Sequence, residues 1–252
     1  MIERFHGKKV LITGAGTGMG KAVALRLAQE GAQLILIGRR ANLIDELVAQ
    51  INQSGGTALA ISCDMSDESS LLDTMTHIRE HFGELHGLFA NAGILGEFSP
   101  LVTTKKDTFA KLIETNLYGT FLTIQQCLPL MKDGSIVINA SWTTQSVMPG
   151  AGAYAATKGA LLSIMKTLAI EEGMRGIRVN TISPGIILTP MAADALDDTL
   201  RDKLASHSAL KRNGTPDDVS GTVAWLLSDD STFVTGQDIT IDGGYTIGGA
   251  RL

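Results

Sequence analysis

The sequence has few cysteines, no cluster of basic residues and no long apolar run, and each absence excludes a class of protein. Its 2 cysteines, Cys63 and Cys127, are far apart and lie within apolar runs. We therefore interpret them as reduced core residues rather than as a disulfide. Because residues 1–6 also lack a secretory pattern, we expect a cytoplasmic protein.

The charge and hydropathy of the chain argue against two kinds of partner. The formal net charge is −5 and lysine and arginine form no cluster, so nucleic acid is not expected as a partner. No apolar stretch approaches the ~18 residues that a membrane span requires. The chain has 252 residues, 44% of them hydrophobic, and neither repeats nor a low-complexity linker. These features predict one globular domain over residues 1–252.

Short apolar strands alternate with helical segments along the chain. The expected strands are 8–13, 33–38, 57–63, 85–90, 135–140, 178–183 and 237–242. The expected helices are 21–30, 41–53, 67–82 capped by Ser66, 106–131 with a break near Pro129, 152–171, 186–212 and 216–228. Buried-type strands that alternate with helices predict an α/β fold, with a parallel sheet covered by helices on both faces. Ligands bind such sheets at the carboxyl ends of the strands.

A glycine-rich loop joins the first strand to the first helix. Its glycines follow T-G-x-x-x-G-x-G at Thr13, Gly14, Gly18 and Gly20; in the commoner G-x-G-x-x-G spacing, the last glycine would fall on Met19. Glycines let the backbone approach a pyrophosphate, and the helix N-terminus offers free N–H groups. A plain glycine-rich turn is the alternative, but the flanking strand and helix favour phosphate binding.

Tyr154 and Lys158 are four residues apart in an expected helix and therefore share a face. A tyrosine has a pKa near ~10, and an ammonium group within about 4–6 Å lowers it. A tyrosine tuned in this way gives a proton to a carbonyl oxygen or takes one from an alcohol. Ser141 ends the strand 135–140, where its hydroxyl can bond the same oxygen. A chance i, i+4 pair is the alternative.

The ordered set of motifs resembles the short-chain dehydrogenase/reductase family over nearly the whole chain. The set is Thr13-Gly14-xxx-Gly18-x-Gly20, Asn91-Ala92-Gly93, Asn116, Ser141, Tyr154-xxx-Lys158, Asn180, Pro184-Gly185 and Asp242-Gly243-Gly244. The resemblance implies a Rossmann-like, doubly wound parallel sheet of seven strands with helices on both faces. It also implies an NAD(P)-dependent oxidoreductase that interconverts a ketone and a secondary alcohol. Ala90, where many members have a second asparagine, and the bulky Trp142 depart from the family pattern.

The resemblance also implies roles for individual residues. Tyr154 would be the acid/base, Ser141 would orient the substrate oxygen, Lys158 would lower the tyrosine pKa and hold the nicotinamide ribose, and Asn116 would support a water in a proton relay. The residues implied in cofactor binding are Gly14, Thr17, Gly18, Met19, Gly20, Arg39, Asp64, Met65, Asn91, Ala92, Gly93, Tyr154, Lys158, Pro184, Gly185, Ile187 and Thr189. The implied substrate pocket contains Ser141, Trp142, Thr143 and Met191, and residues 186–212 would form a lid.

Four of these residues have structural alternatives. Asp64 is equally well explained as a turn residue at a strand end, and Ser141 as a helix cap. Thr189, which precedes a proline, is explained by a turn alone. Asn116 is explained as a solvent-facing residue of a helix, although its apolar neighbours favour a buried position with a partner.

The end of the second strand predicts NADP(H) rather than NAD(H) as the cofactor. NAD sites place an acidic residue there to bind the ribose 2′-OH, and this chain has Gly38 at that position. Glycine leaves room for a 2′-phosphate, and Arg39 can hold it with charge-assisted hydrogen bonds. The alternative is that Arg39 and Arg40 are solvated turn residues that pair with Asp45 or Glu46.

The substrate and the assembly are less closely defined by the sequence. Ile186, the loop 145–152 and the segment 190–212 are expected to wall the pocket. Residues 190–212 are rich in Ala, Leu and Met and favour a largely apolar ketone or alcohol, with a 3-oxoacyl carrier-protein substrate as an alternative. A dinucleotide-binding sensor without turnover is a further alternative, because a fold does not imply a function. The resemblance implies a homotetramer. Small residues on helix 152–171 and an apolar face at Phe109, Leu112, Ile113 and Phe121 support it.

One motif points to a different chemistry. His77, Glu80 and His81 spell H-x-x-E-H, and the two histidines share a helix face as zinc ligands would. His86 lies nearby, but the sequence offers no convincing third ligand. A solvated face on a helix between two strands explains the motif, so we expect no metal.

Overall fold

The computed structural model describes residues 3–248, whose strands form one parallel sheet in the order β3-β2-β1-β4-β5-β6-β7. The seven-stranded, doubly wound sheet that the sequence predicts is thereby confirmed. The strands are β1 Lys9–Thr13, β2 Gln33–Gly38, β3 Thr57–Ser62, β4 Leu85–Ala90, β5 Met131–Asn139, β6 Arg178–Pro184 and β7 Asp238–Ile241.

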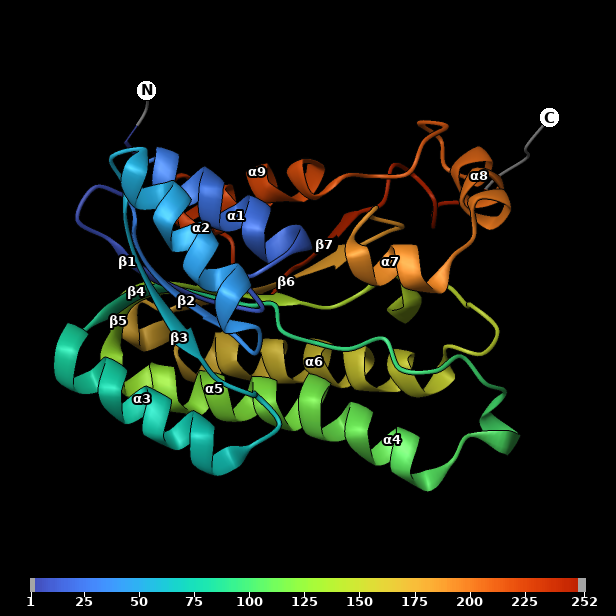
Figure 1. The fold of residues 1–252 in the computed structure, drawn as a ribbon, viewed down its shortest axis with the longest axis horizontal. Helices are drawn as coiled ribbons and strands as arrows, with labels where there is room; N and C mark the ends of the chain where they lie inside the picture. Colours follow the sequence, from blue (N-terminus) through green and yellow to red (C-terminus); the bar gives the residue numbers. More distant parts are fainter. Residues whose placement is uncertain (1–2, 249–252) are drawn as a thin grey trace.

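Helices cover both faces of the sheet (Figure 1). The helices are α1 Gly18–Gln29, α2 Ala41–Gln53, α3 Glu68–Phe82, α4 Lys106–Leu112, α5 Gly119–Cys127, α6 Gly152–Glu171, α7 Pro190–Ala195, α8 Asp198–His207 and α9 Pro216–Leu227. One face carries α1, α2 and α9, and the other carries α3, α4, α5 and α6. Along residues 3–248 we find no helix that combines the length and the apolarity needed to cross a membrane.

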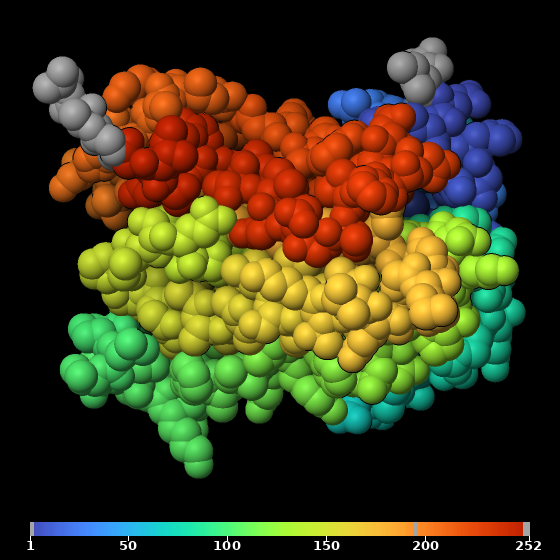
Figure 2. Space-filling model, turned by 180° about the vertical axis from the view of Figure 1, so that it is seen from behind, coloured from blue at the N-terminus to red at the C-terminus, as the bar shows by residue number. Residues whose placement is uncertain are grey.

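The alternation of side chains along β5 shows how the sheet serves two cores. Ile136 and Ile138 pack into the core beneath α5 and α6, whereas Val137 packs into the core beneath α1 and α9. All three side chains are fully buried, as expected for a central strand of a parallel sheet. The C-terminal segment (red) lies against α6 (yellow to gold) on the face that Figure 2 shows.

The order of the strands determines where a ligand can bind. From β1 the chain proceeds outward to β2 and β3, and it then returns to place β4 on the other side of β1. The loops that leave β1 and β4 therefore diverge at the carboxyl edge, and ligands of doubly wound sheets bind in such a crevice.

Three local predictions were wrong. The helix expected over 106–131 is interrupted by a π-helical turn, Ile113–Tyr118, and β5 already begins at Met131, although the expected break near Pro129 is present as the 3₁₀ turn Leu128–Leu130. The register between β4 and β5 shifts between Leu85 and Gly87, because residues 132–134 form a bulge that resembles a turn in sequence. Asp67, rather than Ser66, caps α3, because the Ser66 hydroxyl donates to Asp64.

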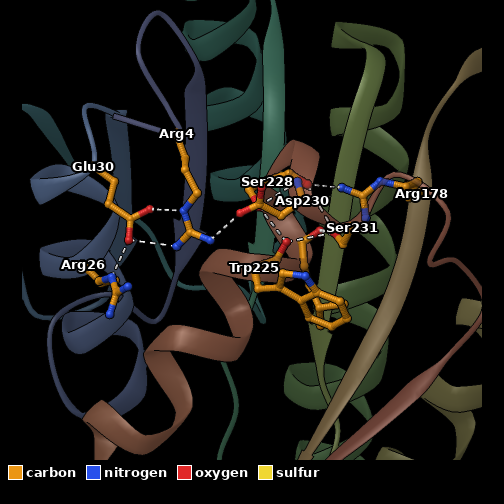
Figure 3. Close-up of polar contacts among 9 residues, drawn as sticks. Arg4, Arg26, Glu30, Arg178, Trp225, Ser228, Asp230 and Ser231 are labelled. Atoms are coloured by element: carbon orange, nitrogen blue, oxygen red, sulfur yellow. Dashed lines mark hydrogen bonds and ion pairs between the residues drawn. The ribbon is translucent and has the colours of Figure 1, made fainter. Parts of the chain in front are cut away.

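A charged network ties the N-terminal segment to the edge of the sheet opposite that crevice (Figure 3). The Arg4 guanidinium lies between Glu30, at 2.6 Å and 2.9 Å, and Asp230, at 3.0 Å. Arg26 also donates to Glu30. Burial by itself would raise the pKa of Glu30, but the hydrogen bonds from Arg4 and Arg26 outweigh burial and hold that pKa below its ordinary value.

We expect Glu30→Gln to lower the free energy of unfolding by about 1 kcal/mol, because the ion pairs with Arg4 and Arg26 become hydrogen bonds to an uncharged amide. The melting temperature should fall by about 2–4 °C at neutral pH. Since the folded state lowers the pKa of Glu30, the advantage of the natural protein should be complete above pH 4.5, the ordinary value, and shrink below it. Thermal melts at several pH values measure this difference.

Asp230→Asn serves as the control for this measurement. The Asp230 side chain is 59% exposed and contacts the same arginine. Exposed ion pairs contribute little, so this variant should melt close to the natural protein. Equal destabilisation by the two substitutions would show that the contribution of Glu30 to the free energy of unfolding does not depend on its burial.

Candidate active site

The loops after β1 and β4 are joined by Thr13 and Asn91. The Thr13 hydroxyl accepts hydrogen bonds from the N–H groups of Asn91 and Ala92, both at 3.0 Å. In return, the Asn91 side chain donates to the carbonyl oxygens of Thr13, at 3.0 Å, and Gly14, at 3.2 Å. The two loops therefore form one rigid floor at the diverging point of the sheet.

The glycines of the first loop are required by close contacts. A Cβ atom on Gly20 would lie 2.3 Å from the Gly14 carbonyl oxygen, and one on Gly14 would lie 2.9 Å from Asn91 Nδ2. Gly18 has φ +55°, and a Cβ there would lie 3.0 Å from Thr189. Gly14 and Gly20 thus allow the loop to pack on the floor, whereas Gly18 allows it to approach Thr189 across the crevice.

A cavity of about 680 Å³ lies above this floor. Most of the residues that the resemblance implies in cofactor binding line it together: Gly14, Thr17, Gly18, Met19, Arg39, Asp64, Met65, Asn91, Ala92, Gly93, Tyr154, Lys158 and Thr189. A cavity of this size, bordered by glycines and by the start of α1, suits an elongated ligand with phosphate groups.

Two arginines lie where the second strand ends. Arg39 Nη1 is 3.8 Å from Asp64 Oδ2, so the carboxylate that faces Arg39 belongs to Asp64 and not to Asp45 or Glu46. Arg40 Nη2 donates to the Thr17 hydroxyl at 3.2 Å. Arg39 and Arg40 both line the cavity. The sequence predicted only Arg39 as a cofactor-binding residue.

Tyr154 and Lys158 lie together at the inner end of this cavity. Lys158 is buried, its Nζ donates to the Asn139 carbonyl oxygen at 2.7 Å, and it lies 5.8 Å from the centre of the Tyr154 ring. Burial raises the pKa of Tyr154 to about 12, against the effect of its hydrogen bond with Ser141. Burial also lowers the pKa of Lys158 to about 8.

In the protein by itself, burial therefore sets the direction of both pKa values, and the lowering of the Tyr154 pKa by Lys158 stays a prediction. The physical reason is that burial disfavours the phenolate and the ammonium alike; Lys158 is buried, and Tyr154 is half-buried where it lines the cavity. At neutral pH the phenol carries its proton and the lysine is mainly charged.

Asn116 lies in the π-helical turn and is fully buried. Its side chain accepts from the Ile94 N–H at 2.8 Å, donates to the Ile94 carbonyl at 2.9 Å and donates to the Thr157 hydroxyl at 3.3 Å. The amide thus fastens the loop after β4 to α6, one residue before Lys158. Asn116 does not line the cavity above the floor or the smaller cavity described next. Because its side chain is fully buried, Asn116 is not the solvent-facing helix residue that the sequence allowed as an alternative.

A smaller cavity of about 120 Å³ adjoins the first at Tyr154, and Ser141 lines the smaller one. The predicted substrate-pocket residues Ser141, Trp142, Thr143 and Met191 all line it. Trp142 is buried and packs edge-on against Tyr245, with ring centroids 4.9 Å apart. The Ser141 hydroxyl accepts from the Thr143 N–H at 3.2 Å, so Ser141 is a helical cap as well as a pocket residue.

This geometry can be compared with known proteins. A family model described as enoyl-(acyl carrier protein) reductase matches residues 14–246. A short-chain type dehydrogenase/reductase from Mycobacterium ulcerans is 30% identical in a solved structure, with a TM-score of 0.91, covering 96% of this chain and 91% of its own. The chain belongs to the short-chain dehydrogenase/reductase family.

Named relatives of this family member act as oxidoreductases. Glucose 1-dehydrogenase of Gluconobacter oxydans is 36% identical over 98% of this chain and 95% of its own length. A 3-oxoacyl-(acyl-carrier-protein) reductase of Thermotoga maritima is 36% identical over 97% of this chain and 100% of its own. The crystal structure of levodione reductase matches with a TM-score of 0.93 at 33% identity, over 97% of this chain and 100% of that one. The protein is an oxidoreductase that acts on CH–OH or C=O groups with a nicotinamide dinucleotide.

The residues present fit such a dinucleotide. The glycine floor has no room for side chains, and the large cavity leads to Tyr154. Pro184, Gly185 and Ile187, expected in cofactor binding, line the smaller cavity instead, and Gly20 lines neither because it packs under the loop. Thr189 lines both cavities and caps α7, since its hydroxyl accepts from the Ala192 N–H at 3.2 Å.

Some residues of the smaller cavity were missed from the sequence. Leu95 and Phe98 line it, but they stand in a loop whose course no short motif reveals, whereas Met148 and Leu196 lie in segments that the sequence places in the pocket wall. Asn139 lines both cavities, and its signal was available, because it is a polar residue inside the apolar run before Ser141.

The histidine motif of α3 is explained by the helix itself. The His77 and His81 rings stack, with centroids 4.0 Å apart, and His81 Nδ1 lies 2.9 Å from the His77 carbonyl oxygen. Within residues 3–248, no group of three or more His, Cys, Asp or Glu side chains is arranged to hold a metal ion.

Proposed function

We propose that this enzyme reduces a compact, largely apolar ketone to a secondary alcohol, and catalyses the reverse reaction, with Tyr154 as general acid/base and NADPH as the preferred dinucleotide. The observation that carries the proposal is the place of Tyr154, which lines both the large cavity and the small, apolar one, with Ser141 beside it in the small cavity. A carbonyl that enters the small cavity would meet the phenol there. The dinucleotide supplies the hydride.

Each of the four residues in the proposed catalytic set has a different role. With a pKa near 12, the Tyr154 phenol holds a proton that it can give to the carbonyl oxygen at neutral pH. Ser141 orients that oxygen. Lys158 is positively charged below about pH 8 and stabilises negative charge on the tyrosine as its proton leaves. Asn116 holds α6 against the loop that follows β4, and it is thus a positioning residue.

The size of the small cavity supports a compact substrate. At about 120 Å³, with Leu95, Phe98 and Trp142 in its wall, it suits a small ring or a short chain better than a carrier-bound 3-oxoacyl group. In this proposal residues 186–212, which include α7 and α8, close over the substrate as a lid of a single catalytic domain that spans the chain. The buried, reduced Cys63 and Cys127 support a cytoplasmic location.

Tyr154→Phe tests the catalytic proposal. Because the variant keeps the ring and removes only the proton, kcat for ketone reduction should fall by ~10²–10⁴-fold while the Kd for the dinucleotide changes little. Steady-state kinetics with a panel of cyclic and short-chain ketones, together with fluorescence titration of NADPH, measure both quantities. Tyr118→Phe, at an exposed tyrosine, is the control. Retention of most activity by Tyr154→Phe would refute the mechanism, and no turnover in the natural protein would favour a sensor.

Arg39→Ala tests the cofactor preference. Loss of a charge-assisted hydrogen bond to a 2′-phosphate should lower kcat/KM with NADPH by about 10- to 100-fold and leave NADH nearly unaffected. Arg79→Ala, on the distant α3, is the control. Gly38→Asp with Arg39→Ile should favour NADH, provided that Ile44 shifts, because a Cβ on Gly38 would lie 3.1 Å from its side chain. A natural protein that uses NADH as well as NADPH would contradict the preference.

We also propose a two-fold-symmetric homotetramer, in which α5 and α6 contact other copies. Phe109 and Phe121, each 40% exposed, and Tyr118, 42% exposed, support an apolar surface along α4 and α5. Leu112, which the sequence analysis placed on that face, is buried within the monomer.

Light scattering at micromolar concentration should give the mass of four chains. Phe121→Asp should shift the mass towards smaller species, because a carboxylate in an apolar interface is costly. Val102→Asp, at a 94% exposed position in the 3₁₀ turn Leu101–Thr103 outside α5 and α6, should leave the mass unchanged. A monomeric natural protein would rule out the assembly.

A further inference from the structure

Thr143 is the middle residue of the 3₁₀ turn Trp142–Thr144, which begins directly after Ser141. Its side chain is half-buried, and it lines the smaller cavity together with Ser141 and Tyr154. The resemblance to the family implies only a place in the substrate pocket for Thr143. The proposed mechanism gives its hydroxyl no role.

Two hydrogen bonds from Thr143 reach the same oxygen atom, Ser141 Oγ. The Thr143 N–H donates to it at 3.2 Å, and the Thr143 hydroxyl donates to it at 2.9 Å. A serine hydroxyl has two acceptor lone pairs and one hydrogen to donate. Both lone pairs are therefore occupied by one residue, and the Ser141 hydrogen must point away from Thr143.

The group that receives the Ser141 hydrogen is the Tyr154 hydroxyl. A hydrogen bond from Ser141 opposes the rise in the pKa of Tyr154 that burial causes, as a donor to the phenolate oxygen does. A hydroxyl that accepts two hydrogen bonds is also polarised by them, which makes it a stronger donor. Thr143 thus acts on both the direction and the strength of the bond that Ser141 gives.

We propose that Thr143 is a positioning residue whose hydroxyl holds Ser141 as a hydrogen-bond donor toward Tyr154 and toward the carbonyl oxygen of the ketone. This inference rests on the proposed function. The Ser141 hydrogen is not transferred, because Tyr154 gives the proton. Without the Thr143 hydroxyl, one lone pair of Ser141 loses its partner and the Ser141 hydrogen is free to rotate away from the ketone.

Thr144 offers a matched control within the same turn. Its hydroxyl donates to the backbone carbonyl oxygen of Ser141 at 2.8 Å, and Thr144 lines neither of the two cavities. Thr144 therefore supports the turn without a bond to the Ser141 hydroxyl. Substitutions at the two threonines separate an effect on the turn from an effect on Ser141.

Thr143→Val keeps the shape of the side chain and removes its hydroxyl. With NADPH and the ketone of the panel that gives the highest kcat/KM, kcat should fall by about 3- to 10-fold, as expected for one neutral hydrogen bond. The Kd for NADPH should change little. Thr143→Ser restores the hydroxyl and should recover most of the lost kcat, although it lacks the methyl group. Thr143→Ala carries the same comparison with Thr143→Ser should the valine variant fail to fold.

A second measurement shows whether Thr143 acts through Ser141. In a Ser141→Ala background, Thr143→Val should lower kcat no further, because residues that act through one group are not additive. The pH profile of kcat for oxidation of the corresponding alcohol by NADP⁺ gives an independent readout. A weaker donor to the phenolate raises the pKa of Tyr154, so the rise of this profile should move to higher pH in Thr143→Val.

Three results would overturn the inference while the natural protein still reduces the ketone. The first is equal loss of kcat in Thr143→Ser and Thr143→Val, and the second is the same loss in Thr144→Val. The third is a full further loss when Thr143→Val is added to Ser141→Ala. If the natural protein reduces no ketone of the panel, the proposed function itself fails, and the inference fails with it.

Discussion

The hydrogen bonds between Thr13 and Asn91 join the loops that follow β1 and β4, and the rest of the site depends on this connection. A doubly wound sheet separates the ends of β1 and β4, and without a connection the two loops would move independently. The Asn91 amide closes this gap by bonding two carbonyl oxygens of the glycine loop. Gly14 and Gly20 have to be glycines because the floor leaves no room for Cβ atoms. The same amide then orients Asn139, so the geometry extends from β1 across β4 to β5.

The site is a set of polar groups buried at the end of an apolar sheet. Such burial is costly unless each group finds a partner, and here most partners are backbone atoms. Lys158 bonds the Asn139 carbonyl, and Asn116 bonds both polar groups of the Ile94 backbone. Backbone partners do not move or titrate, so they hold the side chains in one geometry without changing their charge. The rigidity of the site therefore comes from the sheet and the π-helical turn.

The sequence predicted the sheet, the bounds of α6 and the grouping of most site residues, because these depend on periodicity and on the carboxyl ends of parallel strands. The sequence-based predictions were wrong where a short segment is compatible with two local structures. Residues 132–134 resemble a turn and form a bulge inside β5, and Ser66 resembles a cap but bonds Asp64. The walls at Leu95 and Phe98 depend on how the loop after β4 returns to the site, which no local pattern encodes. The sequence shows the spacing of Tyr154 to Lys158 but not the burial that raises the pKa of Tyr154, so the effect of Lys158 on that pKa stays a prediction.

The burial of Tyr154 and Lys158 bears on the direction in which the site is ready to act. With the pKa of Tyr154 near 12 and that of Lys158 near 8, the protein by itself holds a neutral phenol beside an ammonium group at neutral pH. This is the protonation state that reduction of a carbonyl requires, since the phenol has a proton to give. Oxidation of an alcohol needs the phenolate, which burial disfavours, and the positive charge of an oxidised nicotinamide ring favours it. In the proposed mechanism, the protein charge alone thus favours the reductive direction, whereas the oxidative direction would depend on the charge that the dinucleotide carries.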